Sequence, residues 1–253
     1  QLKTAIRLIN KHGRVRGERG LPALLPGLNF IAGLNGETKA TYDMNMALLR
    51  NIRAEGLLLR RINIRQVEGE GFQEIPGEAF TGFKTTCRDE IDKPLLEELF
   101  PLGQVIHDVH WESHDGRTRL PIHETELHRT PGIHGKAGIT FGRQIGAYPI
   151  LVGVEYKIPL ETQSSVMITG HGARSITGVE LGLDPLRVSE KQLEAIPGIG
   201  KNSAWNLVAA RAKALSKRKT GHPFETPQSW FEQAKVLWND DFDPFFSPYN
   251  HYE

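Results

Sequence analysis

The residues with the clearest potential for chemistry form the turn Pro197-Gly198-Ile199-Gly200-Lys201. Ser189 with Gln192 three residues later makes a capping box, which predicts a short helix that Pro197 ends. A second helix follows, with apolar residues at helical spacing from Ala204 onward. The glycines give the turn backbone freedom, and its amides lie at a helix N-terminus beside a lysine. The pattern therefore predicts an anion site of the kind that holds phosphate.

The two helices are expected to pack through five apolar residues, Leu193, Ile196, Ile199, Ala204 and Leu207. A basic run further along extends the predicted footprint: Arg211, Lys213, Lys217, Arg218 and Lys219. Residues 189–212 resemble the helix-hairpin-helix family, which contacts nucleic-acid backbones without reading their sequence. The resemblance implies nucleic-acid contacts at Gly198, Ile199, Gly200, Lys201 and Arg211. The alternative is a helical hairpin used only for packing.

The N-terminal third contains the pattern of a strand, a helix and a second strand. Residues 28–34 form a short apolar run, Glu37 and Thr38 open a helix to about Ala54, and residues 61–67 alternate polar and apolar. This spacing predicts two parallel strands joined by a crossover helix. Gly33 in the turn after the first strand would let a ligand approach the backbone there. A tight structural turn explains the same glycine equally well.

The stretch Phe30-Ile31-Ala32-Gly33-Leu34-Asn35-Gly36-Glu37-Thr38 resembles the fifth strand and turn of radical S-adenosylmethionine enzymes, with Asn35 where proline is usual. The likeness extends to an archaeal group of these proteins and covers most of the chain up to about Arg211. It implies that Ile31 and Gly33 lie against S-adenosylmethionine. It also implies that Asn63, Arg65 and Gln66 point from the last strand toward cofactor or substrate. Salt bridging at the barrel end is the alternative for Asn63 and Arg65.

The chain departs from that family in its cysteines. The family's Cys-x-x-x-Cys-x-x-Cys motif, which holds a [4Fe-4S] cluster, has no counterpart, because Cys87 is the single cysteine. Cys87 lies in a predicted helix and is expected to be a small core residue. The chain also begins without Met, and the simplest expectation is that the cysteine motif lies on a preceding segment. A degenerate domain without chemistry is the alternative, and in either case this chain alone is not expected to be catalytic.

The middle of the chain shows short apolar runs separated by Gly, Asp and Pro, which predicts a small β-barrel. Residues 160–180 resemble the closing strands of the TRAM domain, an OB-like barrel of tRNA-modifying radical enzymes. The implied oligonucleotide contacts are Arg117, Arg119, Lys136, Arg143 and Arg174, each of which could equally be a solvated surface charge. Six of the ten histidines lie between His107 and His134, but only His110 and His114 have a familiar ligand spacing. No metal site is predicted.

The sequence thus predicts a mixed chain with four parts. They are the C-terminal part of a partial (β/α) barrel (1–101), an OB/TRAM-like β-barrel (102–184), a helix-hairpin-helix (185–219), and an aromatic and acidic tail (220–253) that frays beyond Trp238. No apolar run is long enough to span a membrane, and one cysteine fits the reducing cytoplasm. The expected function is the C-terminal portion of a radical S-adenosylmethionine enzyme that acts on nucleic acid, with RNA favoured over DNA. The rival is a non-catalytic nucleic-acid-binding protein with a degenerate barrel.

Overall fold

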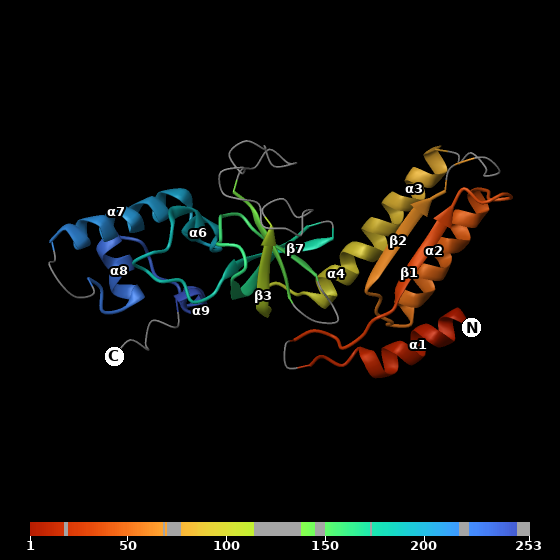
Figure 1. Cartoon of the computed structure of the whole chain (residues 1–253), viewed down its shortest axis with the longest axis horizontal. Helices are drawn as coiled ribbons and strands as arrows, with labels where there is room; N and C mark the ends of the chain where they lie inside the picture. The colour runs from red at the N-terminus through yellow and green to blue at the C-terminus, as the bar shows by residue number, and fades with distance from the viewer. Residues whose placement is uncertain are drawn as a thin grey trace. The chain divides into compact units, whose positions relative to one another are not determined.

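The computed structural model describes residues 1–17, 20–67, 69, 77–113, 138–144, 150–172, 174–217 and 223–246. The chain divides into two compact units (Figure 1), one formed by Gln1–Pro101 and one that begins at Leu102. Each unit is described by itself below. No helix in the described ranges is long and apolar enough to cross a membrane.

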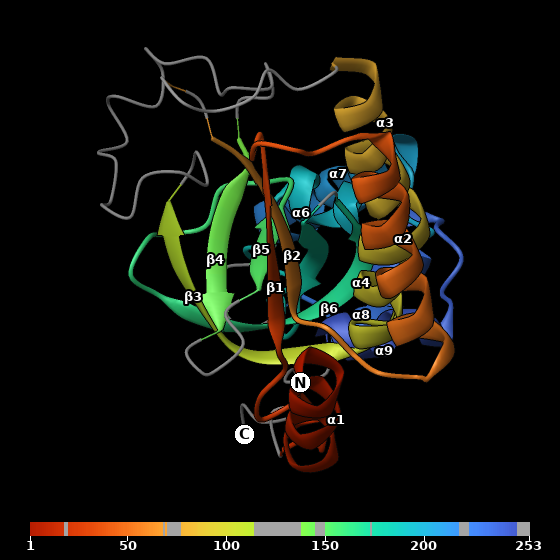
Figure 2. The ribbon, with the colours of Figure 1, turned by 90° about the vertical axis from the view of Figure 1, so that its right-hand side faces the viewer.

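The first unit is a two-stranded parallel sheet with helices. Strands β1 (Gly27–Ala32) and β2 (Arg61–Gln66) pair in parallel, as the sequence predicts, and the crossover helix is α2 (Lys39–Ala54). Helix α1 (Leu2–Gly13) precedes β1. After β2 come α3 (Gly77–Cys87), a π-helical turn η1 (Arg88–Asp92) and α4 (Lys93–Leu99). Figure 2 shows α2, α3 and α4 on the same side of the two strands.

Aromatic packing holds these helices to one face of the sheet. The Phe83 ring of α3 lies 5.7 Å from the Phe30 ring of β1 and 5.5 Å from the Tyr42 ring of α2. Because side chains alternate along a strand, Asn29 and Ile31 point to the opposite face from Phe30. That second face carries no helix in the described part of the unit, and Ile31 is 52% exposed on it.

The second unit begins with a closed five-stranded β-barrel. Its strands are β3 (Val105–Ser113), β4 (Thr140–Gln144), β5 (Leu151–Val154), β6 (Gln163–His171) and β7 (Ser175–Glu180), in the closed order β3-β4-β5-β7-β6. Strands β5 and β7 pair in parallel and the other neighbours are antiparallel. A small β-barrel in this part of the chain is what the sequence predicts. Strand β4 is an addition to the prediction.

One buried aromatic side chain and two glycines allow the strands of the barrel to pack closely. Trp111 is fully buried, and its indole Nε1 donates a hydrogen bond to Ser164 Oγ at 2.9 Å. A Cβ atom at Gly178 would lie 2.2 Å from Val166, and one at Gly142 would lie 2.5 Å from the His110 carbonyl oxygen. Glycine is therefore required at both positions for the strands to approach each other.

Helices complete the second unit. They are α6 (Glu190–Ala195), α7 (Lys201–Lys217), α8 (Pro227–Ala234), a 3-10 turn η2 (Asp240–Phe242) and α9 (Asp243–Phe246). The expectation that the chain frays beyond Trp238 is wrong up to Phe246. Phe242, Phe245 and Phe246 are buried in one core with the hairpin helices, a core that also includes Val179 of the barrel. Burial of these aromatic rings drives this segment to fold onto the hairpin.

Candidate nucleic-acid interface

The hairpin forms as its local sequence dictates. In α6, Ser189 Oγ accepts a hydrogen bond from the Gln192 amide at 3.2 Å, and Gln192 Oε1 accepts one from the Ser189 amide at 2.9 Å. This reciprocal pair is the predicted capping box. All five residues predicted to pack the two helices are buried, namely Leu193, Ile196, Ile199, Ala204 and Leu207. The predicted hairpin is therefore confirmed as a structure.

The turn is held by its own backbone and by one aromatic ring. The Ile199 amide donates to the Ile196 carbonyl at 3.0 Å, and the Ile199 side chain is only 4% exposed. Gly198 has φ +92°, a conformation that favours glycine, and a Cβ atom there would lie 3.3 Å from the Phe242 ring. Ile199 is thus an internal anchor, while Gly198, Gly200 and Lys201 are exposed on the outside of the turn.

The N-terminus of α7 differs from those of its neighbours. The Gly200 carbonyl accepts a hydrogen bond from the Ala204 amide at 2.9 Å, so Gly200 is the N-cap residue. Helices α6 and α8 are capped by hydroxyl groups, because Ser189 Oγ and Thr226 Oγ1 accept from backbone amides. Glycine has no side chain to do this. The first amides of α7, which have no acceptor within the helix, are therefore left for an acceptor from outside.

The charges of α7 favour an anionic acceptor. Its 17 residues include four basic side chains and no Asp or Glu. Lys201, Lys213 and Lys217 are exposed, and within the described ranges their ammonium groups form no ion pair. Among the described residues, Lys201 is thus the unpaired cation at the turn, and Lys213 and Lys217 lie further along the helix.

Arg211 is placed differently from the other predicted contacts. Its Nη1 donates to the Pro185 carbonyl at 3.0 Å and to the Val188 carbonyl at 2.6 Å, and the guanidinium lies 5.9 Å from the centre of the Trp230 ring. Burial of the guanidinium lowers the Arg211 pKa, partly offset by the charge of Asp184. The guanidinium therefore joins α7 to the segment before α6, and it is not part of the exposed surface of the turn.

Two of the predicted barrel contacts lie within the described residues. The Arg143 guanidinium pairs with Glu112 at 3.3 Å, across β4 and β3, and Arg174 is exposed beside the turn between β6 and β7. Arg117, Arg119 and Lys136 lie outside the described residues, as does His114, the partner of His110 in the only familiar metal spacing. Among the residues that are described, no three His, Cys, Asp or Glu side chains gather as a metal site.

The predicted cofactor residues lie at the carboxyl ends of β1 and β2. The parallel register pairs Asn29 with Asn63 and Ile31 with Arg65, and Asn63 Nδ2 donates to Asn29 Oδ1 at 2.8 Å. These side chains share the face of the sheet that lacks helices. Gln66 is paired with Ala32, so strand alternation directs it to the opposite face. Gln66 therefore does not share a face of the sheet with Asn63 and Arg65.

The turn after β1 is fixed by an acidic residue whose role the sequence did not indicate. Gly33 has φ +98°, and its amide donates to Glu37 Oε2 at 2.8 Å. The Tyr42 hydroxyl donates to the same oxygen at 3.3 Å, and burial together with the Glu37 charge raises the Tyr42 pKa. Glu37 thus fixes the conformation of the turn and occupies the buried Gly33 amide. Glu37 follows Gly36 directly, and an acidic residue at this position could have indicated that it holds the turn.

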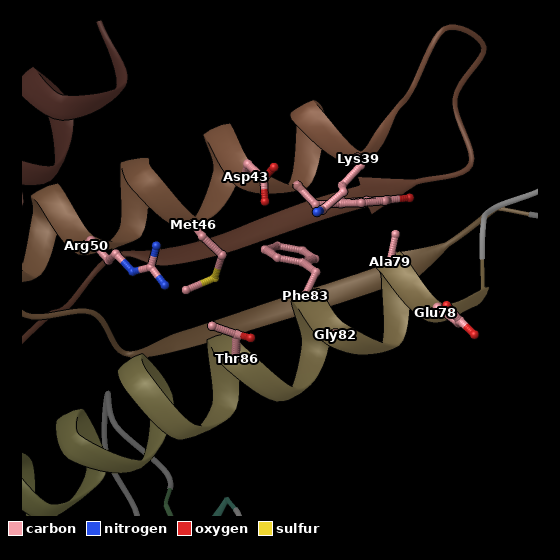
Figure 3. Close-up of a pocket in the computed structure, with 10 residues that line it drawn as sticks. Lys39, Asp43, Met46, Arg50, Glu78, Ala79, Gly82, Phe83 and Thr86 are labelled. Carbon is pink, nitrogen blue, oxygen red and sulfur yellow. The ribbon is translucent and has the colours of Figure 1, made fainter.

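A groove in the first unit lies elsewhere. A groove with a volume of about 600 Å³ runs between α2 and α3, and Figure 3 shows Met46 and Phe83 pointing into it from the two helices. Lys39, Asp43 and Glu78 lie along its rim, and Arg50 at one end is bound by Glu90 at 2.7 and 2.9 Å. The groove is on the helical side of the sheet, opposite Asn63 and Arg65. It is not the site that the sequence predicts.

One exposed residue beside the hairpin was also missed. Trp205 lies one helical turn after Lys201 and is 61% exposed. The apolar residues around it predict the helix, but no role is predicted for the Trp205 side chain. The exposure of Trp205 could have been predicted, since it falls outside the positions of Ala204 and Leu207 on the buried side of the helical repeat.

Comparisons with known proteins identify archaeal relatives. The chain is 37% identical over 204 residues to an uncharacterized protein of Archaeoglobus fulgidus, a match that covers 77% of this chain and 34% of the relative. It is 34% identical over 185 residues to an uncharacterized protein of Methanocaldococcus jannaschii, which covers 69% of this chain and 30% of that protein. The chain thus spans about a third of the length of these relatives. No family model matches it.

Proposed function

We propose that the hairpin grips nucleic-acid phosphate and that the chain is the substrate-holding portion of a cytoplasmic radical S-adenosylmethionine enzyme acting on nucleic acid, RNA rather than DNA. The observation that carries the nucleic-acid part is the glycine-capped N-terminus of α7. Its first amides have no capping side chain, Lys201 stands exposed at the first helical position, and the helix holds no acidic residue. Amides at a helix N-terminus beside a cation are suitable hydrogen-bond donors to phosphate oxygens.

The barrel supports the same substrate class. OB-type barrels are small five-stranded Greek-key barrels that bind oligonucleotides through a strand face and the adjoining loops. This barrel has five strands in closed order, with the hairpin helices packed on its last strand through Val179. In our proposal an OB/TRAM-like face and the hairpin hold one nucleic-acid strand together.

The end of β1 supports the cofactor part of the proposal. Ile31 is exposed at the end of β1, next to the turn that Glu37 holds at Gly33, and Asn63 and Arg65 share its face of the sheet. These groups suit hydrogen bonding to S-adenosylmethionine, which in the family supplies the radical chemistry.

The [4Fe-4S] cluster does not fit this chain. Cys87 is 1% exposed inside α3, and the described residues offer no set of metal ligands. The proposal therefore assigns the cluster ligands to another part of a longer protein. No reaction step is assigned to the residues of this chain.

The hairpin's role is tested by replacing Lys201 with Glu. Binding of the chain to a labelled 20-nucleotide RNA is measured by fluorescence anisotropy between 50 and 200 mM salt. We expect the affinity to fall steeply with salt, and Lys201→Glu to lower it roughly tenfold and to reduce the salt slope by about one. The matched control is Lys39→Glu, which makes the same charge change at the first position of α2. Equal affinities of Lys201→Glu and the parent would refute the role of the hairpin.

The second candidate is a non-catalytic nucleic-acid-binding protein, and the single buried cysteine favours it. The full reading frame separates the two. An in-frame Cys-x-x-x-Cys-x-x-Cys motif, together with reductive cleavage of S-adenosylmethionine by the reconstituted full-length protein, supports the enzyme. If the full reading frame has no such motif, the enzyme proposal is wrong and the binding protein remains.

A further inference from the structure

Trp205 is the one tryptophan of this chain that stands largely in solvent. Trp111 and Trp230 are fully buried, and Trp238 packs edge-on against Phe231 with ring centres 4.8 Å apart. Trp205, at 61% exposure, leaves most of an indole ring uncovered on α7. A large apolar side chain in this state is informative, because folding normally buries it.

The surroundings of Trp205 are polar and basic. Lys201 precedes it by four residues and so lies on the same side of the helix, with Cβ atoms about 6 Å apart. Asn202 and Asn206 are exposed on its flank, and Lys213 and Lys217 follow along the helix. The exposed surface of α7 around Trp205 thus presents one aromatic ring beside one lysine and two amides.

The composition of the surface around Trp205 favours single-stranded nucleic acid as a partner over a protein or a duplex. A protein-docking surface has a contiguous apolar centre, whereas the next large exposed apolar side chain of α7, Leu215, lies ten residues on and about 15 Å along the axis. Aromatic rings placed among cations are the arrangement that binds single-stranded nucleic acid, because bases stack on the rings and phosphates contact the cations. In a duplex the faces of the bases are already stacked on each other and offer no partner to an indole ring.

We propose that Trp205 stacks on an unpaired base next to the phosphate held by the hairpin, so that the substrate is a single-stranded or locally unpaired segment. The inference rests on the proposed nucleic-acid role of the hairpin and narrows its substrate class. Lys201 and the turn amides hold the backbone without regard to pairing, and Trp205 selects a nucleotide whose base is free.

The test uses the whole chain and two probes, a mixed-sequence 12-nucleotide RNA and the blunt 12-base-pair duplex that contains the same strand. Trp205→Ala is expected to weaken binding of the single strand roughly 5- to 150-fold, the range that corresponds to base–aromatic stacking, and to change duplex binding less than twofold. Trp205→Phe keeps an aromatic ring and should retain most of the affinity. The single strand should quench the tryptophan emission of the parent, and this quenching should be lost in Trp205→Phe but kept in Trp238→Phe.

Each outcome bears on one proposal or both. If Trp205→Ala binds the single strand as the parent does, or loses both probes equally, the stacking role is wrong. If Lys201→Glu still weakens both probes in that case, the phosphate grip stands without the stacking. If the parent binds neither probe, both proposals fail. Thermal unfolding of Trp205→Ala and Trp205→Phe shows whether either change has disturbed the fold, and agreement of the two variants with the parent is expected because the side chain is exposed.

Discussion

At the scale of single residues, Lys201 and Arg211 of α7 have different structural roles. Lys201 is exposed at the first position of α7, while the Arg211 guanidinium is half-buried and donates to the carbonyls of Pro185 and Val188. These carbonyls lie in the segment that connects the barrel to α6, where no strand or helix supplies them with donors. Arg211 satisfies them, and this explains why its charge is kept inside in spite of the cost of burial.

We predict that Arg211→Met lowers the free energy of unfolding by about 1–3 kcal/mol, because it leaves two carbonyl groups without their donor. Lys213→Met on the exposed side of α7 is the control, and its effect should stay within about 0.5 kcal/mol. Urea unfolding followed by tryptophan emission measures both. A folded Arg211→Met protein that keeps its stability but loses RNA affinity would instead make Arg211 a direct contact.

At the scale of elements, the hairpin depends on a segment far along the chain. Phe242 lies against Gly198 at the turn, and its ring centre is 5.6 Å from that of Phe231 in α8. The Trp230 indole Nε1 donates to the Leu207 carbonyl of α7 at 2.8 Å. The helices from Pro227 to Phe246 therefore support the hairpin from behind and leave its turn exposed.

Phe242→Ala is expected to lower the free energy of unfolding by about 3–5 kcal/mol, the cost of removing a buried aromatic ring. Leu237→Ala is the matched control in the same segment, because Leu237 is 92% exposed and its removal should cost little. Hydrogen exchange of the α7 amides should accelerate in Phe242→Ala alone. Similar stabilities of the two variants would show that the segment does not support the hairpin.

The elements that the sequence predicted are those determined locally. The capping box at Ser189, the stop at Pro197 and the short strand before Gly33 each depend on neighbours within a few residues. Strand β4 was missed because its inward residues include Thr140 and Gln144, which hide the usual alternation of apolar and polar positions. Thr140 Oγ1 donates to the Tyr156 carbonyl at 2.8 Å and Gln144 Nε2 to the His107 carbonyl at 2.8 Å.

The candidate site also divides into residues that can be predicted from near neighbours in the sequence and residues that cannot. The turn residues Gly198 to Lys201 could be named from spacing alone. The internal role of Arg211 and the burial of Phe242 depend on partners some 23 to 44 residues away in the sequence, which no local pattern reveals. Gln66 follows Arg65 directly in the sequence, but the alternation of the strand places it on the opposite face from Asn63 and Arg65.

At the scale of the whole molecule, the barrel and the hairpin form one cooperative body in the second unit. Val179 of β7 belongs to the hairpin core, and Gln192 Nε2 of α6 donates to Glu180 Oε2 of β7 at 3.3 Å. Burial raises the Glu180 pKa above its ordinary value of 4.5, against the opposing hydrogen bonds from Ser164 and Gln192. The carboxyl group at this junction therefore keeps its proton to a higher pH in the folded protein than in the unfolded chain.

The stability contribution of Glu180 should accordingly depend on pH. Since its folded pKa is raised, the contribution is complete below pH 4.5, the unfolded value, and is lost as the pH rises through the folded pKa. Glu180→Gln should therefore be more stable than the parent at pH 7 and equal to it near pH 4. Chemical unfolding at both pH values measures the difference, with the exposed Glu225→Gln as the control. A difference that does not change with pH would contradict the prediction.

The glycine at the start of α7 has a consequence for any attempt to stabilise this protein. Replacing an N-cap glycine by serine or aspartate gains only a few tenths of a kcal/mol on average, and helix-cap substitutions are a common choice in engineering. At Gly200 the new side chain would accept from the amides that we assign to phosphate. Thermostability and substrate retention would then be opposed at a single position. A library selected for stability alone would lose binding through a substitution that every folding assay reports as an improvement.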